Sequence, residues 1–226
     1  FTSVNFNMMI MIIYALITIA IFGMWYYARY EGNFLPSPKK TFNPMMIVAI
    51  VILVPGTQFA ANFIANLTGY IRPDWLQQYN ELFETSGITD TTFVTVLYSV
   101  ILAPICEELI FRGVTMRCAR KALPFALANL MQAALFGLFH LNWIQGIYAF
   151  ALGIVLGYVC ERGGSIYYSM GLHLLFNLWG TLSGFFPDPG NSVVVFVVVI
   201  VVTIVSLVAG FVLFNKGRRK LPINST

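Results

Sequence analysis

Seven long apolar runs limit what this chain can fold into. They lie near residues 8–27, 45–67, 92–112, 125–142, 146–160, 166–184 and 192–214, and the fifth is the shortest. A helix needs about 20 mostly apolar residues to cross a hydrocarbon layer of roughly 30 Å, which is the length that most of these runs reach or approach. With 58% hydrophobic and only 10% charged residues, the composition excludes an ordinary soluble domain. The sequence therefore predicts an all-α, polytopic membrane bundle of about seven transmembrane helices, with lipid as its main solvent.

The chain shows no sign of division into separate domains. It has no internal repeat and no low-complexity linker, although a proline-containing stretch at 34–44 separates the first two runs. No small-residue cleavage site follows the run at 8–27, so we interpret that run as a retained anchor. We expect a single membrane-embedded domain over residues 1–226, with a motif-bearing core at about 92–184.

Charged residues alternate between the two ends of the predicted helices. One set of connections carries most of the basic residues, namely Arg29, Lys39, Lys40, Arg117, Arg120, Lys121, Arg162, Lys216, Arg218, Arg219 and Lys220. The other set has Arg72 and the acidic residues Asp74, Glu81, Glu84, Asp90 and Asp188. Because Lys and Arg collect in cytoplasmic loops, the C-terminus is predicted to be cytoplasmic. The net charge of +4 then reflects membrane topology and gives no reason to expect nucleic acid as a partner. The short loops favour a bacterial or archaeal cell membrane.

Apolar residues recur at helical spacing between the second and third runs. They are Trp75, Leu76, Tyr79, Leu82 and Phe83. This spacing predicts an amphipathic helix on the outer surface, which serves either as an interfacial anchor or as a lid.

Ionisable side chains occur where lipid should exclude them. Glu107, Glu108 and Arg112 fall in the third run, and the only two histidines of the chain fall in later runs, His140 in the fourth and His173 in the sixth. A charge at the centre of a bilayer costs about 2.5–3.5 kcal/mol on insertion scales, so each needs a reason. Neighbouring glutamates point about 100° apart on a helix, whereas Glu108 and Arg112 are four residues apart and share a face. We assign Glu108 and Arg112 to a buried ion pair and Glu107 to chemistry; the reverse assignment of the glutamates stays open.

The spacing along the chain places four polar residues at a similar depth. Glu107 and His140 are equally distant from a turn expected at residues 123–124, so an antiparallel hairpin would let them face each other. Asn177 follows His173 by four residues and projects from the same helix face. Each of these residues alone could be an interhelical hydrogen-bonding group, but together they predict one polar site built from three helices.

Three motifs in this region resemble those of a known family. They read EELIFRG at 107–113, FGLFH at 136–140 and HLLFN at 173–177. They are similar to the motifs of the CPBP family, which contains the CAAX proteases and the bacteriocin-processing enzymes and is also called the Abi family. Outside the motifs, the first two runs and the last resemble the family only in being hydrophobic.

The resemblance implies an all-α intramembrane endopeptidase. In such an enzyme Glu107 and His140 would activate water, and His173 and Asn177 would stabilise the oxyanion formed at the scissile carbonyl. These roles suit the residues, because a carboxylate removed from bulk water is a stronger base and N–H donors stabilise developing negative charge. Phe136, one helical turn before His140, either shapes the pocket around that imidazole or is plain packing.

The sequence leaves the need for a metal open. Glu107, His140 and His173 would also make a three-ligand zinc site with water in the fourth position, and members of the family are often called metalloproteases. No His-Glu-x-x-His helix is present. We favour direct water activation by Glu107 and His140, with zinc as the alternative.

Other functions remain as competing hypotheses. A transporter or proton relay would also use intramembrane carboxylates and histidines, but the chain lacks an inverted repeat and paired broken helices. A catalytically silent scaffold or peptide-immunity protein of the same fold is a further alternative. Prenylated CAAX-type C-termini, secreted peptide precursors and other membrane-bound peptides are all candidate substrates, and the sequence leaves the oligomeric state undecided.

Overall fold

The computed structural model describes residues 3–31, 43–86, 92–183 and 192–218. This part of the chain is 92% helical and contains no strand, which confirms the predicted all-α class. Its helices are α1 (Ser3–Tyr26) with the π-helical turn η1 (Tyr27–Glu31), α3 (Pro44–Ile71), α4 (Pro73–Ser86), a composite helix of α5 (Phe93–Val96), η2 (Leu97–Leu102), α6 (Ala103–Glu108), η3 (Leu109–Met116) and α7 (Arg117–Ala119), then α8 (Phe125–Phe139), α9 (Trp143–Gly163), α10 (Ile166–Ser183) and α11 (Val193–Gly217).

Helices occupy all seven predicted positions, but within the described residues only five are long and apolar enough to span a membrane. These are Met8–Arg29, α3, the composite helix, α9 and α11. Helix α8 has only 15 residues and α10 only 18. The fourth helix is therefore the short one, whereas the fifth, predicted to be short, has 21 residues. The apolar run of α8 continues past Phe139, so hydropathy alone placed its end too late.

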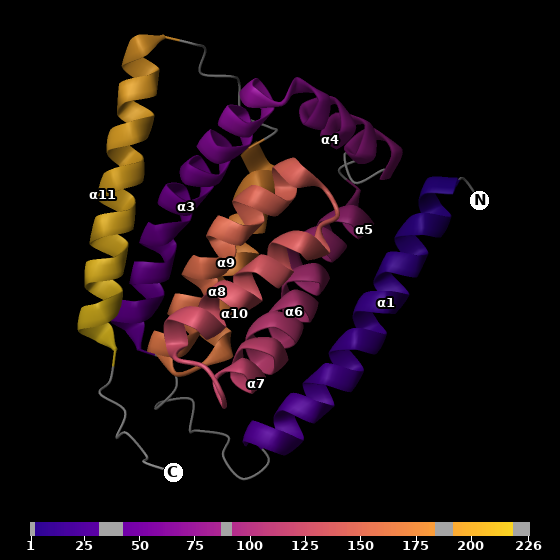
Figure 1. Ribbon diagram of the computed structural model, residues 1–226, viewed down its shortest axis with the longest axis vertical. Coiled ribbons are helices and arrows are strands. Elements are labelled where there is room, and N and C mark those ends of the chain that lie inside the picture. The colour runs from indigo at the N-terminus through magenta and orange to yellow at the C-terminus, as the bar shows by residue number, and fades with distance from the viewer. Residues whose placement is uncertain (1–2, 32–42, 87–91, 184–191, 219–226) are drawn as a thin grey trace.

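The long helices on the two flanks enclose the motif-bearing helices (Figure 1). Helix α11 lies beside α3 on one flank, α1 lies beside the composite helix on the other, and α8, α9 and α10 lie between them. Glycines bring α3 and α11 together: a Cβ on Gly210 would meet the side chain of Leu53 at 2.6 Å, and the Gly56 N–H donates to Ser206 Oγ at 2.9 Å. Small residues allow this close approach, which is typical of membrane helices.

Basic residues gather at one end of the bundle. The ends of α1, α9 and α11 and the whole of α7 lie there, whereas α4 lies across the opposite end (Figure 1). At that opposite end Arg72 pairs with Asp74 at 2.6 Å. The described residues therefore have the charge asymmetry expected from the sequence. Six of the charged residues used in that prediction fall outside the described residues: Lys39, Lys40, Asp90, Asp188, Arg219 and Lys220.

The predicted amphipathic helix is present as α4. Its Trp75 ring stacks on Trp143 at the start of α9, with ring centroids 5.3 Å apart. Its Tyr79 shares a hydrogen bond with Tyr148 of α9. These contacts fix α4 next to the α8–α9 connection. The side chain of Phe83 lies outside the described residues.

Candidate active site

The expected ion pair lies in the centre of the bundle. Arg112 Nη1 donates to Glu108 Oε1 at 2.8 Å, and neither side chain exposes any surface. Arg112 also donates through Nη2 to the Gly153 carbonyl of α9 at 3.3 Å. The four-residue spacing of Glu108 and Arg112 predicted this ion pair, and the structure confirms it. The pair ties the composite helix to α9.

His173 of α10 lies between the two glutamates. Its Nδ1 is 2.9 Å from Glu108 Oε1, and its Nε2 is 3.5 Å from Glu107 Oε2. The Glu108 side chain is fully enclosed, whereas that of Glu107 is 14% exposed. Glu108 therefore holds both Arg112 and His173, and it does more than the purely structural role assigned from the sequence. A carboxylate on Nδ1 orients an imidazole and leaves Nε2 as its working nitrogen.

His140 lies immediately beyond the last residue of α8. Its Nδ1 is 2.8 Å from the Phe136 carbonyl oxygen, which accepts the Nδ1–H and so leaves the Nε2 lone pair free. The next residue, Leu141, has a φ of 54°, a left-handed conformation that non-glycine residues seldom adopt. Strained backbone of this kind is concentrated at functional sites, and here it ends α8 at the histidine. The hairpin argument predicted that His140 and Glu107 face each other. Within the described residues, no hydrogen bond or ion pair joins them directly.

The Phe136 ring connects the two histidines. Its centroid lies 5.0 Å from that of His140 and 5.7 Å from that of His173, with near-perpendicular planes in both cases. The Arg112 guanidinium lies 4.5 Å from the same centroid. Phe136 is 1% exposed. The ring is thus a core residue whose neighbours are the charged and imidazole groups of the site.

Asn177, on the same face of α10 as His173, bonds back to the composite helix. Its Nδ2 donates to the Ser99 carbonyl oxygen at 2.8 Å. In the π-helical register of η2 this carbonyl would accept from residue 104, but Pro104 has no N–H. The amide of Asn177 replaces the missing donor and keeps its second N–H for another acceptor.

Comparison with known proteins identifies the segment that carries these residues. Residues 89–179 match the family model described as type II CAAX prenyl endopeptidase, Rce1-like. Over this segment, which is less than half of the chain, the sequence is similar to the CAAX prenyl endopeptidase family. All three motifs fall within it, and the match supports the activity of an intramembrane endopeptidase. Neither the curated proteins nor the solved structures contain a match to the chain.

Two amides of α8 within the matched segment extend the polar network, and the sequence analysis missed them. Gln132 Nε2 donates to the Gly153 carbonyl oxygen at 2.9 Å and to Asn129 Oδ1 at 2.7 Å. Asn129 Nδ2 donates to the Ile154 carbonyl oxygen at 3.0 Å. Gln132 and Arg112 therefore share one acceptor on α9. Two amides at i and i+3 in an apolar helix, opposite a Gly-x-x-x-Gly stretch at 153–157, were the available signal.

The residues proposed as zinc ligands do not form a metal site in this arrangement. Within the described residues no group of three or more His, Cys, Asp and Glu side chains is placed to hold an ion. His173 Nε2 lies 3.5 Å from Glu107 Oε2, but within the described residues no hydrogen bond or ion pair joins His140 to either of these residues. In this arrangement Glu107, His140 and His173 do not converge as three ligands of one zinc ion would.

Proposed function

We propose that this protein is an intramembrane endopeptidase that cleaves the C-terminal peptide of a prenylated, CAAX-type substrate by direct attack of water. The observation that carries the proposal is the location of His173 between Glu107 and Glu108, inside a segment that matches the CAAX prenyl endopeptidase family. The family description supports a prenylated substrate, and the membrane spans support cleavage of a substrate that is itself attached to the bilayer.

Glu107 and His140 are the proposed water-activating pair. Glu107 is partly exposed whereas Glu108 is fully buried, so water reaches Glu107 more readily than it reaches Glu108. His140 offers Nε2 as an acceptor because its Nδ1 is bound to the Phe136 carbonyl. Water held by these two groups adds its oxygen to the scissile carbonyl carbon and gives up a proton to the pair. That proton then passes to the amide nitrogen as the C–N bond breaks.

Asn177 and His173 are the proposed oxyanion donors. One N–H of the Asn177 amide is used on Ser99, and the second remains to donate to the carbonyl oxygen as it gains negative charge. His173 keeps its Nδ1–H on Glu108, so it donates to the same oxygen through Nε2–H only when the ring is doubly protonated. Donors fixed in a dry site stabilise the transition state because they need little reorganisation.

The direct test compares wild type with Glu107→Gln in liposomes, using a farnesylated peptide that ends in a CAAX sequence and its unfarnesylated twin. We expect wild type to release the C-terminal tripeptide from the farnesylated peptide, with and without a strong chelator, and Glu107→Gln to be inactive. Glu84→Gln is the matched control, since Glu84 is an exposed glutamate on α4. Cleavage by Glu107→Gln at the wild-type rate would refute the site, and equal cleavage of both peptides would refute the prenyl requirement. A folded wild type that cleaves neither peptide would favour the silent scaffold.

A further inference from the structure

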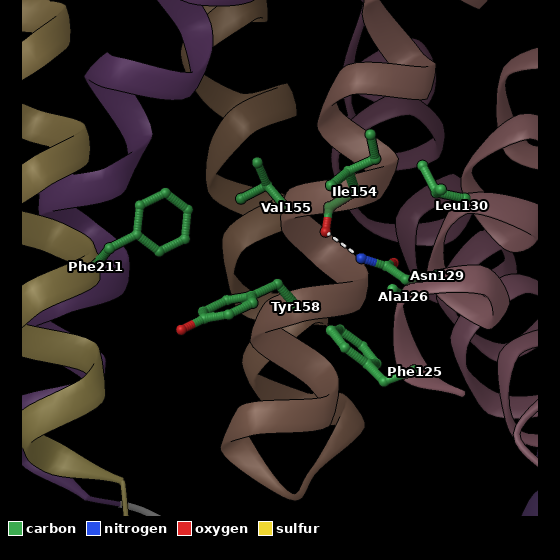
Figure 2. Close-up of a pocket in the computed structure, with 8 residues that line it drawn as sticks. All are labelled: Phe125, Ala126, Asn129, Leu130, Ile154, Val155, Tyr158 and Phe211. Carbon is green, nitrogen blue, oxygen red and sulfur yellow. Dashed lines mark hydrogen bonds between the residues drawn. The ribbon is translucent and has the colours of Figure 1, made fainter.

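A cavity lies between α8, α9 and α11, away from the proposed active site (Figure 2). It has a volume of about 530 Å³, within the usual range of small-molecule pockets. Rings from three helices line it: Phe125 of α8, Tyr158 of α9 and Phe211 of α11, with Tyr158 between the other two in the view. The centroids of Tyr158 and Phe211 are 5.4 Å apart. None of the proposed catalytic side chains takes part in its lining.

A polar rim with one cation beside it borders this groove, and a second cation lies nearby on α11. Tyr158 donates through its hydroxyl to Asn215 Oδ1 at 2.8 Å, and Lys216 follows Asn215 on α11. One turn beyond Tyr158 on α9, the Arg162 guanidinium carbon lies 5.8 Å from the Tyr158 ring centroid. Arg162 and Lys216 are both exposed, and neither side chain has a hydrogen bond or ion pair within the described residues. Arg120, by contrast, is already bound to Glu161 at 3.1 Å.

We propose that this groove binds one anionic phospholipid, with an acyl chain along the three rings and the phosphate between Arg162 and Lys216. Basic residues are common at this end of membrane helices, so their presence alone would not define a site. Here Arg162 lies over a ring that lines the cavity, Lys216 follows the residue that accepts from the hydroxyl of that ring, and the cavity wall is mostly apolar. Basic pockets between membrane helices on the cytoplasmic side are typical binding sites of anionic headgroups. A zwitterionic lipid would fill the apolar part equally well but would gain less from the two cations.

Lipid binding measured on delipidated protein tests this proposal. Native mass spectrometry in a non-ionic detergent would compare dioleoylphosphatidylglycerol with dioleoylphosphatidylcholine at equal concentration. We expect wild type to prefer the anionic lipid by roughly tenfold or more, since each cation near a headgroup contributes independently. Arg162→Gln/Lys216→Gln should bring the preference to about twofold or less. Arg29→Gln, which removes an exposed cation at the same end but on η1, should keep this preference.

A second variant tests the apolar part of the groove. Ala126 is exposed and lines the cavity, so Ala126→Trp fills it without disturbing the core. It should lower the occupancy of both lipids at least several-fold, with unchanged helicity and gel-filtration profile. Equal binding of the two lipids by wild type, or a preference that Arg162→Gln/Lys216→Gln retains, would overturn the proposal. Displacement of the phospholipid by a farnesylated peptide would also overturn it, because the groove would then belong to the substrate. The readout is binding, so this proposal stands or fails separately from the proposed protease activity.

Discussion

His173 Nδ1 lies 2.9 Å from Glu108 Oε1, and this contact makes Glu108 part of the proposed catalytic geometry as well as of the ion pair. One carboxylate oxygen serves both Arg112 and His173. The composite helix, which carries both glutamates, is thereby fixed to α10, which carries His173 and Asn177. Stability and orientation of the site therefore depend on the same side chain.

Glu108→Ala should destabilise the protein by about 3–5 kcal/mol, because it leaves the fully buried Arg112 without its partner. The double variant Glu108→Leu/Arg112→Leu should recover much of that stability, since it removes both charges. It should still be inactive, because His173 has lost the acceptor of its Nδ1–H. Thermal unfolding in detergent and peptide cleavage measure the two effects. An active double variant would show that Glu108 has no part in positioning His173.

Asn177→Ala should lower kcat by about 100-fold to 1,000-fold with little change in KM, as expected when a donor to the oxyanion is lost. Asn177 also binds the Ser99 carbonyl, so the variant should unfold at a lower temperature than wild type. Thr181→Val is the control: it removes a hydroxyl one turn further along α10, where Thr181 bonds only the Asn177 carbonyl. Steady-state kinetics with the farnesylated peptide measure kcat and KM for the two variants and for wild type. A pure KM effect would assign Asn177 to substrate binding.

Phe136→Ala should reduce both stability and activity, because the ring fills the space between Arg112, His140 and His173. Removal of a buried phenyl ring costs about 3–5 kcal/mol. Phe136→Leu should restore most of the stability but less of the activity, because leucine lacks the ring faces and edges that the histidines contact. Equal recovery of melting temperature and of kcat would identify Phe136 as packing alone.

Gly157→Ala should disturb the α8–α9 interface. A Cβ at this position would lie 1.9 Å from Asn129 Oδ1 and 2.7 Å from Gln132 Nε2, so both amides must move. Overpacking of this kind costs about 1–3 kcal/mol. Gly171→Ala on α10 is the matched control, because its Cβ would meet no atom within 4 Å. We expect Gly171→Ala to leave the melting temperature unchanged or to raise it, since alanine stabilises a helix by about 0.5–1 kcal/mol relative to glycine. Similar melting temperatures for the two variants would contradict the tight interface.

The cytoplasmic location of the C-terminal end of α11 is a further proposal. Single cysteines in place of Lys216 and Arg72, in a chain without its three native cysteines, should label from opposite sides of intact vesicles. A membrane-impermeant maleimide added to cells should modify the cysteine at 72 and leave the one at 216 unmodified. Labelling at 216 from outside would reverse the orientation.

The sequence predicted those features of the fold and site that depend on local spacing. The Glu108–Arg112 pair follows from a four-residue interval, and the turn near Pro124 follows from proline chemistry, with α8 beginning at the next residue. The catalytic roles themselves stay predictions, since geometry alone does not test them. Contacts that depend on packing could not be predicted: nothing in the local pattern shows that His173 would reach both glutamates. The π-helical stretches also escaped prediction, because the helical spacing rules assume an α-helix throughout.

Pro104 leaves the Ser99 carbonyl without its intrahelical donor, and Asn177 supplies one from 78 residues further along the chain. A bare carbonyl facing hydrocarbon costs several kcal/mol, so the composite helix inserted alone would be poorly accommodated in lipid. Its burial has to wait for α10, which is synthesised later. Membrane insertion and assembly of these two helices are therefore coupled, and the same amide proposed to serve the reaction also completes the backbone of a distant helix.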